Sequence, residues 1–399
     1  MAASVDRSIR DKAAIVGIGQ TSLTTCSGRT ELELALSAID DALADAGLTP
    51  SDVDGLVRFG ASQIGCSETV IAHNLGIPVL RWWAAIDIGG GASAGLVGQA
   101  AAAVASGQAD VVVGYRSLNG ASLRRPGTNE TTDGLLHHDP SLERHEYPHG
   151  MTAPSQMFAM VARRHMHKYG TTPAQLGSVA VTTRRFANAN PAAQMHDRTM
   201  TLDDYFDAPM ITSPLRRYDC CLRTDGACAF VVTTAERARD LKQKPVFVKG
   251  AVQGTLPMPQ GALYSLLARP DLTESPAAYV ASTLYERAGV GPTDIDVAEL
   301  YDCFTITALL QIEDYGFCAK GEAGPFVEGG NTGPGGTIPV NTAGGNLSEG
   351  YLHGVNHVIE GVRQLRGTAA SQVEGAELCL VTGGLPTPTT AVILGSVAG

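Results

Sequence analysis

One glycine-rich stretch holds the densest set of side chains that could do chemistry. Residues 341–358 read NTAGGNLSEGYLHGVNHV, which places Asn341, Tyr351 and His353 around glycines such as Gly345. Glycines at this density mark a main chain that turns sharply or approaches another group closely. The stretch therefore predicts an active-site loop. The unexpected residue in this loop is Tyr351, a bulky side chain at a turn whose glycines indicate close approach to another group.

A second candidate loop, YDCFT, follows an apolar strand and contains Tyr301 and Cys303. A free tyrosine has a pKa near 10, so at neutral pH its hydroxyl is a hydrogen-bond donor and an acid. It can serve as a base only when its environment perturbs it or links it to another acceptor. Two tyrosines on facing loops could divide the proton transfers of one reaction. The sequence leaves open which of Tyr301 and Tyr351 would be the base.

Composition limits the classes of function. The chain has 399 residues, 44% of them hydrophobic, and a net charge of −11, which argues against a nucleic-acid binder. No apolar run approaches the roughly 18 residues of a membrane span. The eight cysteines form no CxxC pair, which favours reduced thiols and a cytoplasmic location. No metal is expected, because the spacing of the histidines at 137, 138, 145 and 149 fits no standard ligand pattern.

The chain also repeats itself, which bears directly on the fold. The segment ending at Leu56 and the segment ending at Leu300 share a helix stopped by glycine, a proline turn and a strand entry. An apolar strand precedes each copy, and a strand after a long helix follows each, at 109–115 and 376–384. Alternating strands and helices indicate sheets covered on both faces. We therefore expect two similar α/β halves.

Residues 117–218 interrupt this pattern. The segment is polar, rich in turns and longer than an ordinary connection, and its helix is expected to end at Gly170. It predicts an insertion that shapes a pocket. The expected domains are an N-terminal half of residues 1–116 plus 219–240, a loop insertion of residues 117–218 over the active site, and a C-terminal half of residues 241–399.

The two halves, together with the motifs YDCFT, NTAGGNLSEGY and TDGACAFVV, resemble the thiolase superfamily and its sterol-carrier-protein-type branch. The resemblance covers almost the whole chain and implies the five-layered αβαβα thiolase fold. The departures from the family pattern are informative. Gly91 stands where thiolases carry a nucleophilic cysteine at a helix N-terminus, so thiolase-type acyl-enzyme chemistry is not expected. That helix N-terminus could still hold an anion or oxyanion.

Two histidines of the family pattern are also replaced. Tyr351 stands for the histidine of a glycine-histidine-proline turn, and Tyr301 for that of a His-Asp-Cys-Phe motif. Cys303 keeps the position of an acid/base thiol in the sterol-carrier-type branch. Ordinary thiolases carry a C-terminal acid/base cysteine at a position that would fall near Leu380. Cys379 is one position away from it and is expected in the core. Neither cysteine is expected at a helix N-terminus.

This pattern is similar to that of bacterial thiolase-like aldolases that cleave steroid side chains. The resemblance implies retro-aldol cleavage of a β-hydroxyacyl-CoA, such as a 17-hydroxy steroid-20-carboxyl-CoA, to a ketone and propionyl-CoA. It further implies a homodimer bound to a small OB-fold and zinc-ribbon protein as a heterotetramer, with no cofactor except the CoA of the substrate. The alternatives are a conventional thiolase or acyltransferase that uses Cys303, and a non-catalytic sterol or lipid carrier.

The expected site has two sets of residues. The catalytic set is Tyr301, Tyr351, Cys303 and His353, and the substrate-binding set is Gly91, Asn341 and Gly345. CoA recognition is only weakly encoded, by paired arginines in or near the insertion at 124, 125, 184, 185, 216 and 217.

Overall fold

The computed structural model describes most of the chain. The described residues are 8–60, 66–122, 147–151, 153–257, 271–384 and 388–398. Three of the histidines considered above, at 137, 138 and 145, and Arg124 and Arg125 lie outside these ranges. Among the described residues, no group of histidine, cysteine and acidic side chains could hold a metal ion. A search of the same residues finds no helix long and apolar enough to cross a membrane.

The main sheet has nine strands in the order β3-β2-β4-β7-β1-β8-β11-β10-β9. Five come from the first half of the chain: β1 (Ala13–Gln20), β2 (Gly55–Phe59), β3 (Trp82–Ile86), β4 (Val111–Asn119) and β7 (Asp225–Thr234). Four come from the second half: β8 (Val246–Gly254), β9 (Val297–Glu299), β10 (Leu378–Gly383) and β11 (Thr389–Gly395). The halves join where β1 pairs antiparallel with β8, at Ala14 opposite Phe247 and Ile15 opposite Val246.

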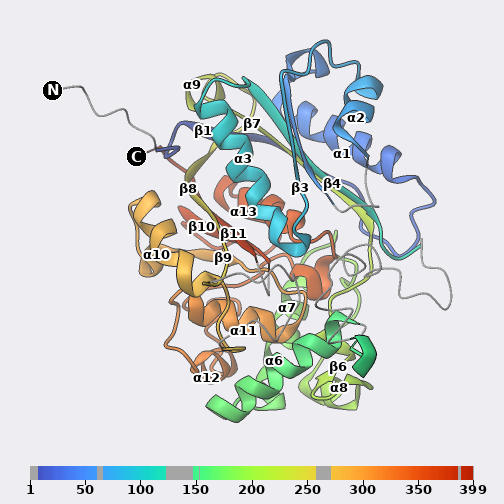
Figure 1. Ribbon diagram of the computed structural model, residues 1–399, viewed down its shortest axis with the longest axis vertical. Helices are drawn as coiled ribbons and strands as arrows, with labels where there is room; N and C mark the ends of the chain where they lie inside the picture. The colour runs from blue at the N-terminus through green and yellow to red at the C-terminus, as the bar shows by residue number, and fades with distance from the viewer. Residues whose placement is uncertain are drawn as a thin grey trace.

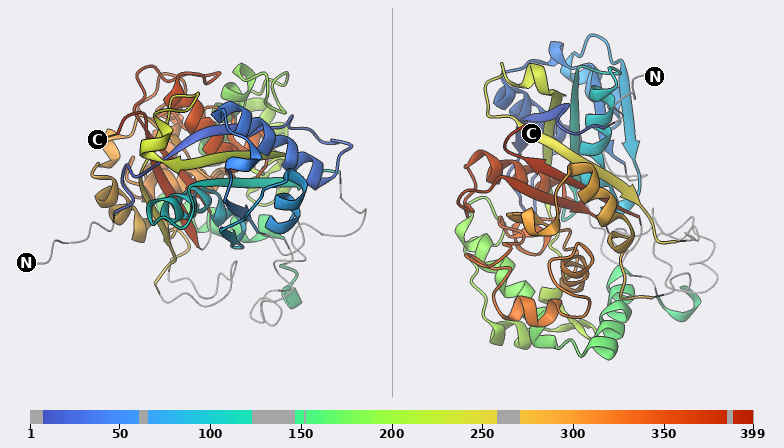
Figure 2. Two further views of the ribbon diagram at one scale, coloured as in Figure 1. Left: turned by 90° about the horizontal axis from the view of Figure 1, so that it is seen from above. Right: turned by 90° about the vertical axis from the view of Figure 1, so that its left-hand side faces the viewer.

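Helices complete a layered arrangement. The helices α3 (Ser93–Ala105) and α13 (Val355–Arg366) both contact strands of both halves, so they form the central layer. The helix α1 (Glu31–Ala46) covers β1, β4 and β7, and α10 (Ala277–Ala288) covers β8 and β11. Figure 1 shows α3 and α13 between the two groups of strands, and the right-hand view of Figure 2 shows the halves one above the other. The layers have the expected αβαβα order. The strands of the two halves form the two β layers, which are joined into one sheet where β1 pairs with β8.

The internal repeat is confirmed. Both α1 and α10 end at a glycine in the left-handed region, Gly47 with φ 73° and Gly289 with φ 69°. A short 3-10 turn that begins with proline follows each helix, at Pro50–Asp52 and Pro292–Asp294, before the strands β2 and β9. Glycine suits both positions because it adopts positive φ without the steric cost of a side chain.

The insertion rests on the second half of the chain. Its helix α6 (Pro154–Tyr169) ends at Gly170 as predicted, and α6 and α7 (Pro173–Ala189) both pack on α11 (Thr305–Asp314). Figure 1 shows these green helices beside the orange α11. The strand β4 continues to Asn119, past the boundary expected at residue 116. The smaller described elements are α2 (Glu68–Leu75), α8 (Leu202–Asp207), β5 (Met210–Thr212), β6 (Leu215–Arg216), α9 (Ala235–Ala238) and α12 (Ala323–Glu328).

A pair of fully buried carboxyl groups lies between β9 and the central helix α13. The Thr342 hydroxyl is 2.8 Å from Glu299 Oε1 and 2.8 Å from Glu360 Oε1. A hydroxyl has one hydrogen and can donate to only one of these oxygens. The carboxyl that does not accept the hydroxyl hydrogen contacts Thr342 favourably only when it carries a proton of its own. The two carboxyls therefore hold a shared proton. Burial, followed by the charge of Glu349, raises the pKa of Glu360 to about 7.

This carboxyl pair predicts a specific pH dependence of stability. Because the pKa of Glu360 is higher in the folded than in the unfolded chain, its contribution is fully present below about pH 4.5 and is lost as the pH rises through about 7. One such group contributes a slope of at most about 1.4 kcal/mol per pH unit. We expect Glu360→Gln, which mimics the protonated acid, to flatten the fall of the thermal midpoint between pH 5 and 8. Equal slopes in the variant and the unchanged protein would contradict the shared proton.

Candidate active site

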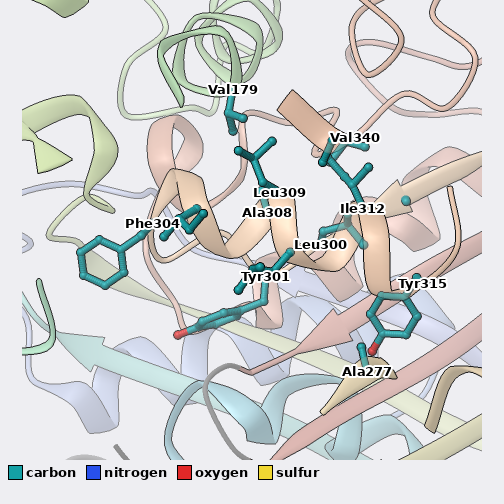
Figure 3. Close-up of a cluster of buried hydrophobic side chains, with 14 of the residues drawn as sticks. Val179, Ala277, Leu300, Tyr301, Phe304, Ala308, Leu309, Ile312, Tyr315 and Val340 are labelled. Carbon is teal, nitrogen blue, oxygen red and sulfur yellow. The ribbon is translucent and has the colours of Figure 1, made fainter. Parts of the chain in front are cut away.

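The two tyrosines singled out from the sequence meet in the structure. The hydroxyl oxygens of Tyr301 and Tyr351 are 2.9 Å apart. Tyr301 lies in the turn between β9 and α11 and is 2% exposed, whereas Tyr351 follows the π-helical turn Gly345–Glu349 and is partly exposed. Figure 3 shows Tyr301 at the edge of an apolar cluster that includes Leu309 and Ile312, with its hydroxyl directed away from α11.

Hydrogen bonds fix the main chain of Tyr301 on both sides. Its N–H donates to Thr382 Oγ1 at 2.9 Å, and its carbonyl accepts from Gln311 Nε2 at 2.6 Å. The Thr382 hydroxyl in turn donates to Gln311 Oε1 at 2.6 Å. One group from β10 and one from α11 therefore hold the turn, so the Tyr301 ring can move only by rotation about its own side-chain bonds.

Asp302 attaches the glycine-rich loop to this turn. Its carboxylate accepts from the N–H of Asn346 at 2.7 Å and of Leu347 at 3.3 Å. Gly345 has φ 57°, and a Cβ there would lie 2.3 Å from Asp302 Oδ2. Glycine is thus required for this approach. Asn341, at φ 57° and fully buried, accepts the Leu300 N–H at 2.7 Å. These contacts give Asn341 and Gly345 a role in shaping the loop, and substrate binding by either remains a prediction.

Residues of the insertion, together with Thr224 just before β7, support the other side of the loop. The Tyr351 N–H donates to Thr224 Oγ1 at 2.8 Å, and the Thr224 hydroxyl donates to Gln194 Oε1 at 2.9 Å. The Gln194 N–H donates to the Glu349 carbonyl at 2.8 Å. Buried Arg184 donates to Ser348 Oγ at 3.0 Å. Arg184 therefore holds the loop that carries Tyr351, whereas the sequence suggested it as a CoA contact.

Glycines just before the two central helices, Gly90 before α3 and Gly354 before α13, make room for Tyr301. A Cβ on Gly90 would lie 2.1 Å from the Tyr301 hydroxyl oxygen, and a Cβ on Gly354 would lie 3.0 Å from Tyr301 Cδ2. A Cβ on Gly91 would instead meet the Pro388 carbonyl oxygen at 2.6 Å. Gly91 thus lies in the expected helix-entry turn, but its neighbour Gly90 faces the phenol. The sequence reasoning missed Gly90, although it belongs to the same run of three glycines.

His353 joins the pair from the same loop. Its ring centroid lies 4.4 Å from that of Tyr351 and 5.0 Å from that of Phe59, so the imidazole packs against both aromatic rings. Its Nδ1 is 3.5 Å from Nη2 of Arg116, a buried residue of β4 whose guanidinium lies 4.5 Å from the Phe59 ring. Sequence reasoning did not find Arg116. His357 is also buried, and its Nε2 is 3.3 Å from Asp302 Oδ1, beneath the loop.

Burial determines the protonation states at the site. The pKa of Tyr301 is raised well above its ordinary value by burial and then by Tyr351, so its hydroxyl stays protonated. Burial, followed by the charge of Arg116, lowers the pKa of His353 well below its ordinary value, so the imidazole is neutral at pH 7. Burial lowers the pKa of Arg116 to about 10, which leaves the guanidinium charged. The site therefore contains the neutral phenol of Tyr301, the phenol of Tyr351 and the neutral imidazole of His353. The buried guanidinium of Arg116 lies beside them.

The cysteines stand apart from this arrangement. Cys303 directly precedes Phe304, the N-cap of α11 (Thr305–Asp314), so it lies near the start of that helix but outside it. Its thiol is nevertheless 6% exposed, lies 3.9 Å from Thr307 Oγ1 and has a pKa raised by burial. Cys379 is fully buried, as predicted. A protonated thiol is a poor nucleophile, so neither is suited to form an acyl-enzyme.

Known proteins match nearly the whole chain. The thiolase N-terminal domain family matches residues 12–236, and the thiolase C-terminal domain-like family matches residues 262–396. The chain is 46% identical over 388 residues to 17-hydroxy-3-oxo-4-pregnene-20-carboxyl-CoA lyase of Mycobacterium tuberculosis, covering 96% of this chain and 99% of the lyase. It is 44% identical over 389 residues to a steroid side-chain-cleaving aldolase of Thermomonospora curvata, covering 96% and 98%.

Solved structures agree with this assignment. The Ltp2-ChsH2(DUF35) aldolase matches with a TM-score of 0.89 and 43% identity, over 97% of this chain and 98% of that one. Human mitochondrial 3-ketoacyl-CoA thiolase, at 14% identity, matches with a TM-score of 0.69 over 98% of this chain and 100% of its own, which shows the shared fold. The layered halves, the helix-entry turn without its cysteine and these matches together establish that the chain belongs to the thiolase family.

Proposed function

We propose that this protein cleaves a carbon–carbon bond in a β-hydroxyacyl-CoA by a retro-aldol reaction, with a 17-hydroxy steroid-20-carboxyl-CoA as the substrate. The observation that carries the proposal is the contact of 2.9 Å between the hydroxyls of Tyr301 and Tyr351, beside a helix-entry turn that has glycine at position 91. Retro-aldol cleavage requires proton transfer and stabilisation of an enolate, but no covalent acyl-enzyme. The names of the relatives, a lyase and an aldolase of steroid side chains, support the same reaction.

The surroundings of the two phenols divide their roles. Tyr301 is held neutral by burial, so it acts as a hydrogen-bond donor. Tyr351 is partly exposed, so its oxygen can meet the substrate, and as the acceptor of the hydrogen bond from Tyr301 it is stabilised when it carries negative charge. The charge of Arg116 acts on both phenols. Tyr351 is therefore the group that takes the proton from the substrate hydroxyl. Tyr301 is the donor that steadies the charge as it develops.

The reaction then balances without oxidant or water. The β-hydroxyl loses its proton to the phenolate form of Tyr351, which becomes a neutral phenol. The substrate oxygen forms the carbonyl of the ketone, and the bond between the α- and β-carbons breaks. The electron pair of that bond forms the enolate of the short acyl-CoA. The proton held by the tyrosine pair is returned to the α-carbon, which gives propionyl-CoA. We propose no cofactor beyond the CoA of the substrate.

The assembly is part of the same proposal. The edge strand β3 pairs on one side with β2, and Trp83 on it is 63% exposed, which supports a homodimer formed along this edge. The related solved structure is the Ltp2-ChsH2(DUF35) aldolase, and the two components in its name support a heterotetramer with a small OB-fold and zinc-ribbon partner. All eight cysteines are free, in keeping with a cytoplasmic location.

A product assay tests the proposed function. The protein is co-purified with its OB-fold partner and incubated with a 17-hydroxy steroid-20-carboxyl-CoA, and the steroid ketone and propionyl-CoA are followed by mass spectrometry. We expect both products in equal amounts. Thiolysis of a 3-ketoacyl-CoA with trapping of an acyl-enzyme would instead identify a conventional thiolase. Tight binding of the steroid CoA ester with no products would identify a carrier.

A further inference from the structure

Arg116 and His353 form a contact that has no part in the proton transfers of the proposed reaction. Arg116 is 1% exposed and comes from β4 in the first half of the chain, whereas His353 belongs to the catalytic loop of the second half. Their nitrogens, Nη2 and Nδ1, are 3.5 Å apart, at the long end of the range for a hydrogen bond. Phe59 packs against both groups: the guanidinium carbon lies 4.5 Å from the centre of its ring, and the His353 ring is tilted by 47° to it with the ring centroids 5.0 Å apart.

The chemistry of the two groups decides which imidazole nitrogen carries the hydrogen. A guanidinium group has donors and no acceptor, so Nδ1 of His353 must present its lone pair to Arg116. In a neutral imidazole the hydrogen then resides on Nε2. Arg116 is also the charged group that acts on His353, and its charge opposes a second proton on the ring. Both effects favour one tautomer of the neutral ring.

We propose that Arg116 is a positioning residue that holds His353 as the neutral tautomer with its hydrogen on Nε2, so that the imidazole serves as a hydrogen-bond donor in the cleft and not as the base. The inference builds on the proposed function, because the acceptor for this donor is the thioester oxygen of the acyl-CoA as it gains negative charge. His353 is partly exposed and packs on the Tyr351 ring, which places it beside the group that receives the substrate proton.

The charged groups around Arg116 are compatible with this role. Glu31 on α1 favours the charged guanidinium, Arg58 on β2 opposes it, and Asp87 lies in the field of both arginines. Glu31 Oε1 accepts the Asn119 N–H at 3.0 Å, and Arg58 donates to Glu68 at 3.1 Å. Both hydrogen bonds are made to groups other than His353.

A spectroscopic measurement tests the tautomer without any assay of cleavage. The protein with its histidines labelled with ¹⁵N is studied at pH 7.5, and the ring signals of His353 are identified by their loss in His353→Asn. We expect one protonated nitrogen, Nε2, and an unprotonated Nδ1 that stays so down to pH 6. In Arg116→Met we expect the tautomers to mix and the ring to protonate between pH 6 and 7. A hydrogen on Nδ1 in the unchanged protein would overturn the proposal, even if the enzyme cleaves its substrate.

Kinetics then show whether Arg116 acts through His353. We expect Arg116→Met to lower kcat about tenfold and to add a loss of activity towards pH 6, with Arg116→Lys recovering part of it. In the His353→Asn background the same change should cost less than about twofold, because neighbouring groups that act as one unit are not additive. Arg366→Met is the matched control, since it removes a guanidinium 5% exposed that binds Asp45 outside the site. Full additivity of the two variants would contradict action through His353.

Discussion

Tyr301→Phe and Tyr351→Phe are each expected to fold normally and to lose cleavage activity by about 100-fold or more. A single well-placed donor to a developing oxyanion contributes on the order of 3 kcal/mol, which corresponds to this factor. Each substitution removes one oxygen and leaves the ring that packs in the loop. In Tyr351→Phe the proton acceptor is gone, so kcat is expected to fall with little change in KM. In Tyr301→Phe the remaining phenol loses the donor that stabilises its charge.

The measurement is the rate of propionyl-CoA release by each variant in complex with the partner protein, with the thermal midpoint measured alongside. Tyr285→Phe is the matched control, because Tyr285 is a largely buried tyrosine whose hydroxyl donates to the Tyr315 carbonyl at 2.8 Å outside the site. If Tyr301→Phe and Tyr351→Phe both cleave at the rate of the unchanged protein, phenol chemistry is wrong. If all three variants lose activity equally, the effect is one of stability.

The fold could be predicted from the sequence because its signals are local. A helix stopped by glycine, a proline turn and a strand entry occur twice, and each signal spans few residues that contact one another directly. Apolar strands such as β1 and β8 carry β-branched residues that are buried on both faces. The start of α11 was harder to predict. Thr305 and Thr307 are weak helix formers, and they conceal the helix that begins just after Cys303.

The site could be predicted only in part, because its geometry depends on contacts between distant segments. The resemblance to the thiolase superfamily, carried by motifs such as YDCFT and NTAGGNLSEGY, implied that Tyr301 and Tyr351 belong to one site. No periodicity connects Arg116 on β4 with His353, which lies in the other half of the chain. The resemblance singled out Gly91 in a run of three glycines, whereas the contact of Gly90 with the Tyr301 ring is visible only in the structure. The direction of a side chain at a helix-entry turn is set by the packing of the turn, which the sequence does not display.

Gly90 supplies the last prediction, and it concerns the room that the helix-entry turn leaves for the Tyr301 ring. A Cβ on Gly90 would lie 2.1 Å from the Tyr301 hydroxyl oxygen and 2.2 Å from Cζ, far inside van der Waals contact. The Tyr301 main chain is held by Thr382 and Gln311, so the added methyl group must displace the ring or the helix-entry turn. Either movement separates the two hydroxyls. We therefore expect Gly90→Ala to lose activity by about 100-fold, as the loss of one donor would.

The test compares Gly90→Ala with Tyr301→Phe and with the double variant. If the methyl group acts by displacing the Tyr301 hydroxyl, the double variant should be no slower than the slower single variant, because the same interaction is lost once. Gly333→Ala is the control, since a Cβ there meets its nearest atom at 3.5 Å, an ordinary contact. Full activity in Gly90→Ala would show that the turn yields and that close approach is not required. The expected loss would instead show that a bare main chain at position 90 is a condition for phenol chemistry in this fold, because any side chain there, including a cysteine, occupies the place of the Tyr301 oxygen.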